Sequence, residues 1–142
     1  MIVVRLLAGN NQEEISDMDT QELHDRGLKL RIDMFGQEAV DKRMSAFGEF
    51  GKPLQHIINA YAYGDVWSRS ALSPATKSLI MIAMMAACGH ANELRVHLQG
   101  AVKNGCQAQE LQEVFLLLAM YCGIPSANEA HSVAADVLGD LG

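Results

Sequence analysis

Three ionisable residues, His90, Glu93 and His97, have a spacing that a single helix would bring to one face. Each helical residue advances about 100°, so the three side chains should lie within roughly 60° of one another. Apolar residues beside them predict that the trio borders a core and is half buried. Burial and a nearby carboxylate both change the proton affinity of an imidazole, which makes the trio a candidate for general acid or base catalysis.

Two plainer interpretations of the trio stay open. A histidine at a helix border is more often a structural or surface residue than a catalytic one. Two histidines and a glutamate could also bind zinc, but histidine ligands on a helix normally lie four residues apart, as in HExxH. His90 and His97 are seven residues apart, so we expect no metal.

The elements that must position these residues are predicted to be helices. The chain has 142 residues, of which 49% are apolar, which predicts a single all-α domain of about six helices from residue 20 to residue 142. Residues 1–19 are predicted to be an N-terminal extension. The helices with the clearest limits are expected at about 20–33, 75–88, 90–104, 109–122 and 127–138.

Particular residues predict where these helices begin and end. Pro53 should open one helix, and Ser73 followed by Pro74 should cap the next, which is apolar on nearly every side and is expected to be a covered, central helix. Gly105 should end the helix that carries the trio. Ser126 should cap the last helix.

Charge and composition exclude several classes of partner. A formal charge of -6 with only 11 basic residues argues against nucleic acid binding. The longest apolar run, Leu79 to Cys88, is about half of what a membrane-spanning helix needs. Three widely spaced cysteines form no CxxC pair or zinc cluster, so we expect a reduced, cytoplasmic setting.

Several segments, taken in order and with their spacing, resemble the carboxymuconolactone decarboxylase family. The resemblance extends from about Gln21 to Leu138, beyond the first twenty or so residues. The segments that carry it are Gly27 to Arg31, Gly64 to Ser73, Glu93 to His97, Gly100-Ala101, Asn104-Gly105 and Tyr121 to Ala127.

The resemblance implies an all-α fold shared with alkylhydroperoxidase D and assembly into homo-oligomers, trimers or hexamers. It also implies a decarboxylation that needs no cofactor. The substrate would be a small carboxylated lactone, 4-carboxymuconolactone, from the degradation of aromatic compounds. In such a reaction the protein must bind the carboxylates, stabilise an enolate and supply one proton.

The resemblance also suggests roles for individual residues. His97 would donate the proton, and Glu93 would orient it or relay the proton. Arg69 would bind the carboxylates, although it could simply pair with a carboxylate of the protein. The remaining candidates for substrate binding are Arg31, Trp67, His90, Tyr121 and His131. Of these, Trp67 could equally be an ordinary core aromatic residue.

Two departures from the family pattern bear on function. The peroxidase relatives carry CxxCxxxH, and here His90, Glu93 and His97 occupy that spacing without the redox thiols. The decarboxylases carry Arg-Pro-His before the Glu-Leu of this helix, where this chain has His90, Ala91 and Asn92. The identity of the lactone substrate therefore stays undetermined. A peroxidase-type redox protein and a non-catalytic, oligomeric ligand-binding module remain as alternatives.

Overall fold

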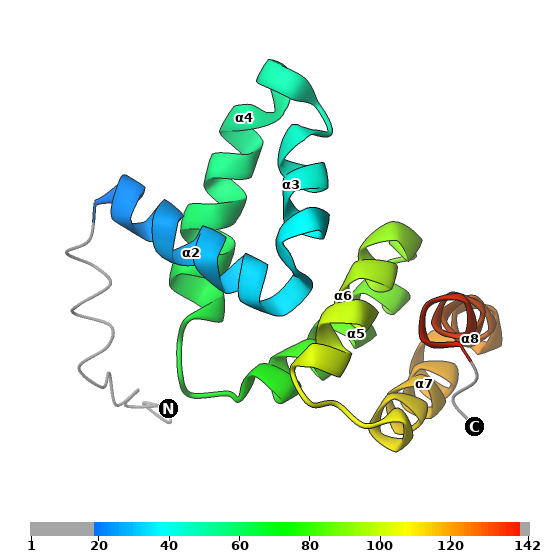
Figure 1. The fold of residues 1–142 in the computed structure, drawn as a ribbon. Coiled ribbons are helices and arrows are strands. Elements are labelled where there is room, and N and C mark those ends of the chain that lie inside the picture. Colours follow the sequence, from blue (N-terminus) through cyan, green and yellow to red (C-terminus); the bar gives the residue numbers. More distant parts are fainter. Residues whose placement is uncertain (1–18, 140–142) are drawn as a thin grey trace, which may run out of the picture. The chain divides into compact units, whose positions relative to one another are not determined.

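The computed structural model describes residues 19–139, and every regular element among them is a helix (Figure 1). The all-α prediction is therefore confirmed. Contacts among the helices divide the chain into two compact units, one ending at Ala71 and the other beginning at Leu72. Of the predicted N-terminal extension, only Asp19 falls within the described residues.

The first unit consists of α2 (Thr20–Phe35), α3 (Gln37–Ser45), α4 (Gly48–Ile57) and η1 (Ile58–Trp67). The last of these is a π-helix that continues α4, and π-helical turns are frequent at functional sites. In Figure 1, α2 lies across the helix formed by α4 and η1, and α3 lies beside α4.

Two glycines allow α2 and η1 to approach each other closely. A Cβ atom on Gly27 of α2 would overlap the main-chain carbonyl oxygen of Asn59, and one on Gly64 of η1 would overlap that of Leu23. Both obstacles are backbone atoms, which cannot rotate away as a side chain can. The two helices therefore touch backbone to backbone, and only glycine fits at the crossing.

Two predicted helix starts in this unit were wrong, that of α4 by several residues and that of α2 by one. Pro53 does not open a helix, because α4 already begins at Gly48 and includes the proline. The positive φ of Gly48, 53°, starts the helix earlier, and Pro53 only removes one hydrogen-bond donor from its interior. Asp19, rather than Thr20, caps α2 by accepting a 2.8 Å hydrogen bond from the backbone N–H of Glu22.

The second unit consists of α5 (Pro74–Ala87), α6 (Ala91–Lys103), α7 (Ala108–Cys122) and α8 (Ile124–Leu138). Helix α5 packs against α6 and α7, and α8 packs against α6 and α7. Their inward faces form one apolar core, whose larger buried members are Ile82, Leu94, Leu98, Leu111, Phe115, Leu118 and Val133.

The sequence predicted the start of α5 correctly but not how far the helix is buried. Ser73 caps the helix as expected, accepting a 3.1 Å hydrogen bond from the N–H of Thr76. The helix is not covered on every side, however, because Ile80 and Met84 are exposed. An apolar helix face thus remains without a partner in this unit.

The start of α8 also differs from the prediction. Ser126 does not cap the helix, because α8 already begins at Ile124. Gly123, with φ of 101°, turns the chain into the helix, and Pro125 falls in the first turn, where a missing N–H costs nothing. Among residues 19–139, no helix is both long and apolar enough to cross a membrane.

The glycine crossing gives a stability prediction. Gly27→Ala should lower the free energy of unfolding by about 3 kcal/mol or more, because the added methyl group meets immovable backbone. Urea unfolding followed by circular dichroism measures the change. Lys29→Ala, at an exposed position of the same helix, is the control and should stay within about 0.5 kcal/mol of the wild type. Equal stability of the two variants would contradict the crossing described here.

Candidate functional site

The imidazole of His97 is buried in the second unit. His97 lies on α6, and 5% of its surface is exposed. It stands among the buried residues of that helix, between Val96 and Leu98, so it is more deeply buried than the predicted half-buried position. A buried imidazole is shielded from bulk water, which makes its proton affinity sensitive to the groups around it.

The other two members of the predicted trio are not buried. Glu93 lies in the first turn of α6 with its side chain exposed, and His90 is the exposed N-cap residue of the same helix. The expectation that all three are half buried was therefore wrong. Helical spacing predicts the direction of a side chain, but the neighbouring helices decide how far the core covers it.

Arg31 is the centre of a buried polar cluster in the first unit. Only 3% of its surface is exposed. Its Nη1 atom donates hydrogen bonds to Oε1 of Gln55 at 3.1 Å and to Oδ1 of Asn59 at 2.6 Å. The guanidinium also lies 5.4 Å from the centre of the Tyr63 ring, a cation–π distance. These uncharged partners hold the guanidinium in one orientation.

Tyr63 connects Arg31 to a second predicted residue, Trp67. The rings of Tyr63 and Trp67 are stacked, with their centres 6.0 Å apart and an angle of 14° between the planes. Phe35 meets the Tyr63 ring edge-on, also at 6.0 Å. The structure thus joins two residues that the sequence had proposed separately, through a tyrosine that sequence reasoning missed. The spacing of four between Tyr63 and Trp67 was the available signal.

A line of hydrogen bonds extends from Arg31 to the surface. Because Arg31 donates to Oδ1 of Asn59, the amide nitrogen of Asn59 faces Nε2 of His24, at 3.0 Å, and donates to it. The Nδ1 atom of His24 then donates to the Asp25 carboxylate at 3.0 Å. This bond, followed by a 2.8 Å bond from Gln21, holds the pKa of Asp25 below its usual value.

Arg69 forms an ion pair with Asp65 one helical turn earlier. Its Nη2 and Nε atoms each lie 3.0 Å from Oδ1 of Asp65. This matches the ordinary interpretation of Arg69, that it pairs with a carboxylate of the protein. Arg69 is also exposed, in contrast to Arg31. A guanidinium already engaged by an anion at the surface is the weaker candidate for binding a substrate carboxylate.

Tyr121 and His131 lie in different parts of the second unit. Tyr121 is 86% exposed near the end of α7. His131, on α8, donates from Nδ1 to the carbonyl oxygen of Ala127 at 2.7 Å, and its ring lies 5.1 Å from that of Phe115. Both His131 and Phe115 line a groove of about 710 Å³ between α7 and α8, and His97 does not line it. Tyr121 does not line this groove either.

The three cysteines have different environments. Cys88 and Cys122 are exposed and Cys106 is buried, and all three are free thiols. Burial, with a smaller contribution from the Glu110 carboxylate, raises the pKa of the Cys106 thiol. A raised pKa reduces the thiolate fraction and so the nucleophilicity of Cys106. Within residues 19–139, no three histidine, cysteine or acidic side chains are placed to hold a metal ion.

Comparison with known proteins identifies similar sequences. The sequence profile of the carboxymuconolactone decarboxylase family matches residues 52–136. A 4-carboxymuconolactone decarboxylase of Acinetobacter baylyi is 35% identical over 125 residues, which cover 88% of this chain and 93% of that protein. A nitrosuccinic acid decarboxylase of the fungus Metarhizium robertsii is 35% identical over 130 residues, covering 89% of this chain and 91% of the relative.

The environments of the cysteines predict their reactivity. At neutral pH, iodoacetamide should modify Cys88 and Cys122 at least about 10-fold faster than Cys106, since burial limits access and the raised pKa keeps the Cys106 thiol protonated. Peptide mass spectrometry over a time course measures the three rates, with unfolded protein in urea as the control. Equal rates in the folded protein would show that Cys106 is accessible.

Proposed function

This chain belongs to the carboxymuconolactone decarboxylase family, and from that premise we propose that it is a cofactor-independent decarboxylase of 4-carboxymuconolactone or a related lactone acid. Both relatives described above are named as decarboxylases, which supports a carboxy-lyase. The observation in this structure that carries the proposal is the buried imidazole of His97.

The substrates named for the two relatives share a chemical feature. Each can lose carbon dioxide from a carbon next to a group that accepts electrons: an unsaturated lactone in one case and a nitro group in the other. When the bond to the carboxylate breaks, its electron pair moves into the dienolate or the nitronate. The remaining step is delivery of one proton to carbon. This common chemistry requires a proton donor and no bound cofactor.

In this proposal His97 delivers that proton. A protonated imidazole transfers its N–H proton to the carbanion-like carbon and becomes neutral, and its burial keeps bulk water from competing. Glu93, one turn earlier on α6 and exposed, is suited to return a proton from solvent to the imidazole. Of the two roles suggested for Glu93, its exposure favours the relay over orientation of a buried ring.

Arg31 is the better candidate for binding a substrate carboxylate. Gln55, Asn59 and Tyr63, which are uncharged, contact and orient its guanidinium, whereas the Asp65 carboxylate pairs with Arg69. Arginine binds carboxylates through two parallel hydrogen bonds, which requires a fixed orientation of the guanidinium plane. The stack of Tyr63 and Trp67 beside Arg31 supplies an aromatic surface of the kind that a flat, unsaturated substrate would contact.

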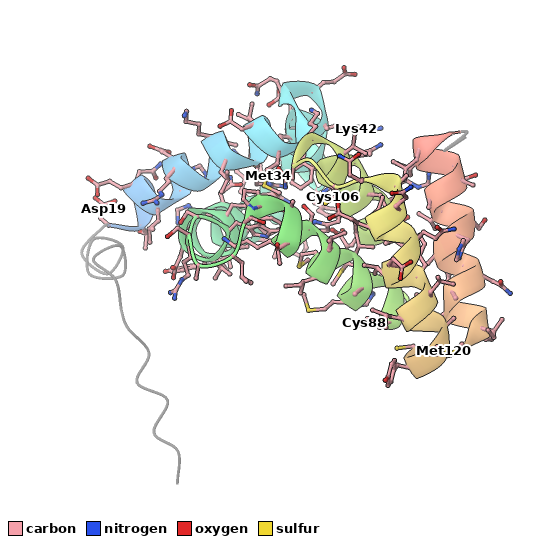
Figure 2. The ribbon with its side chains drawn as sticks, turned by 90° about the horizontal axis from the view of Figure 1, so that it is seen from below. Asp19, Met34, Lys42, Cys88, Cys106 and Met120 are labelled. Carbon is pink, nitrogen blue, oxygen red and sulfur yellow. The ribbon has the colours of Figure 1, made fainter. Side chains whose placement is uncertain are left out.

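The proposal includes a homo-oligomer, a trimer or a hexamer, in a reduced, cytoplasmic setting. Three free thiols suit such a setting. Assembly is supported by a row of exposed apolar residues along α7, of which Met120 is 74% exposed at the end of the helix (Figure 2). The other members of this row are Leu116, Leu117 and Tyr121, and Ile124, the first residue of α8, is exposed as well.

The proposed activity is tested by carbon dioxide release from 4-carboxymuconolactone by the purified chain. His97→Gln should lower kcat by at least about 100-fold, since the glutamine amide cannot donate a proton to carbon. Gln99→Ala, at an exposed position of the same helix, is the matched control and should retain wild-type kcat. Full turnover by His97→Gln would remove His97 from the mechanism. Nitrosuccinic acid, assayed in parallel, distinguishes the two substrate classes.

The two arginines should differ in substrate affinity. Arg31→Met should raise KM by about 10- to 100-fold, the range expected for losing hydrogen bonds to a charged group, whereas Arg69→Met should leave KM within about 3-fold. Arg31→Lys retains the charge and should recover part of the loss. Circular dichroism checks that each variant is folded. A larger rise in KM for Arg69→Met than for Arg31→Met would reverse the assignment.

A further inference from the structure

The side chain of Asn59 joins Arg31 to His24 inside the first unit. Asn59 lies on η1, and none of its surface is exposed. Its Oδ1 atom accepts the 2.6 Å hydrogen bond from Nη1 of Arg31. Its Nδ2 atom donates to Nε2 of His24 at 3.0 Å and to Sδ of Met44 at 3.4 Å. Both N–H donors of the amide thus have an acceptor, and its orientation is fixed by these partners.

The hydrogen bonds of this line all run in one direction. A guanidinium can only donate, so Arg31 requires the oxygen of the Asn59 amide. At the other end, the lowered pKa of Asp25 keeps its carboxylate ionised at neutral pH, where it can only accept. Between these ends, Nδ1 of His24 must carry a proton and Nε2 must not. The line is therefore complete only when His24 is neutral and in the Nδ1–H tautomer.

Titratable and charged groups approach His24 from two sides. On its own helix, α2, the Asp25 carboxylate accepts from Nδ1 at 3.0 Å. From α4, the imidazole of His56 stacks on the His24 ring, with the ring centres 5.0 Å apart and an angle of 10° between the planes. From η1 and α3 come uncharged groups, the Asn59 amide and the Met44 thioether. The side chain of His24 is 16% exposed, so its ring can exchange protons with solvent.

A proton on Nε2 of His24 would break the line at Asn59. A protonated imidazole has an N–H group on both nitrogens, so Nε2 would face the donor Nδ2 of Asn59 as a second donor. Rotation of the amide would give His24 an acceptor, but its NH₂ group would then face Nη1 of Arg31. Because Oδ1 and Nδ2 point in different directions, the oxygen can face Arg31 or His24 but not both. Of its two amide acceptors, Arg31 would keep that of Gln55.

We propose that neutral His24 is a positioning residue of the carboxylate site: through the Asn59 amide it holds the Arg31 guanidinium in the orientation that binds substrate, and its protonation releases that orientation. The inference rests on the proposed function, in which Arg31 binds a substrate carboxylate. Two parallel hydrogen bonds to a carboxylate need a fixed guanidinium plane. Substrate affinity should therefore fall as the pH falls through the range in which an imidazole gains a proton, about pH 8 to pH 5.5.

The first test follows the side chains by NMR and needs no substrate. In protein labelled with ¹⁵N, the ring shifts of His24 distinguish its two neutral tautomers, and they should show Nδ1–H at about pH 8. The side-chain N–H signals of Arg31 should shift with the same pH midpoint as the His24 ring. In His24→Gln, whose amide oxygen can accept from Asn59 at every pH, the Arg31 signals should stay constant. The Nε2–H tautomer, or Arg31 signals that do not follow the protonation of His24, would overturn the proposal.

The second test measures KM for 4-carboxymuconolactone over the same pH range. The wild-type KM should rise at least about 5-fold from about pH 8 to pH 5.5, because a charged group loses well-oriented hydrogen bonds while the substrate carboxylates stay ionised. His24→Gln should keep the wild-type KM at about pH 8 and lose most of the rise. His24→Leu removes the acceptor and should raise KM over the whole range. The kcat of both variants at about pH 8 should stay within about 2-fold of the wild type, since binding alone is changed.

The matched control is His56→Gln, which removes the other imidazole of the stack and leaves the hydrogen-bond partners of His24 in place. It should retain the rise in KM, and circular dichroism checks that each variant is folded at each pH. A flat wild-type KM, a rise kept by His24→Gln or a rise lost in His56→Gln would contradict the proposal. Absence of carbon dioxide release would contradict the proposed function alone, and the NMR test would still decide whether His24 orients Arg31.

Discussion

The backbone contact between α2 and η1 is the constraint on which the first unit depends. Gly27 and Gly64 let the two helices approach until main chain meets main chain, and no residue with a Cβ atom fits at either position. This approach brings Arg31 of α2 against the side of η1 that carries Asn59 and Tyr63. The orientation of the guanidinium therefore depends on the distance between α2 and η1. That distance is possible because Gly27 and Gly64 have no Cβ atoms.

The chemistry proposed for the chain depends on differences in burial along one helix. His97 is withdrawn from water while Glu93, a single turn earlier, remains in it. The residue proposed as proton donor and the residue proposed as relay thus lie on the same helix with different access to solvent. Apolar side chains remain exposed on α4 and α7, and these are surfaces that the proposed homo-oligomer would cover.

Much of the fold could be predicted because helix limits are local. A serine followed by a proline caps a helix whatever lies around it, and the cap at Ser73 is where the sequence placed it. Glycine with a positive φ ends the helix at Gly105, as expected. The errors at Pro53 and Ser126 have one cause. In both cases a nearby glycine with a positive φ started the helix earlier, so that Pro125 lies in the first turn of α8 and Pro53 lies in the interior of α4.

The sequence by itself determined the helical class, the family and the identity of the residues able to move a proton or bind an anion, because these follow from residue type and spacing. Only the tertiary structure decided which of them share an environment. It buried His97 and left Glu93 in solvent, and it joined Arg31 to Trp67 through Tyr63. Burial and contact arise when distant segments pack together, and no periodicity within one helix contains that information.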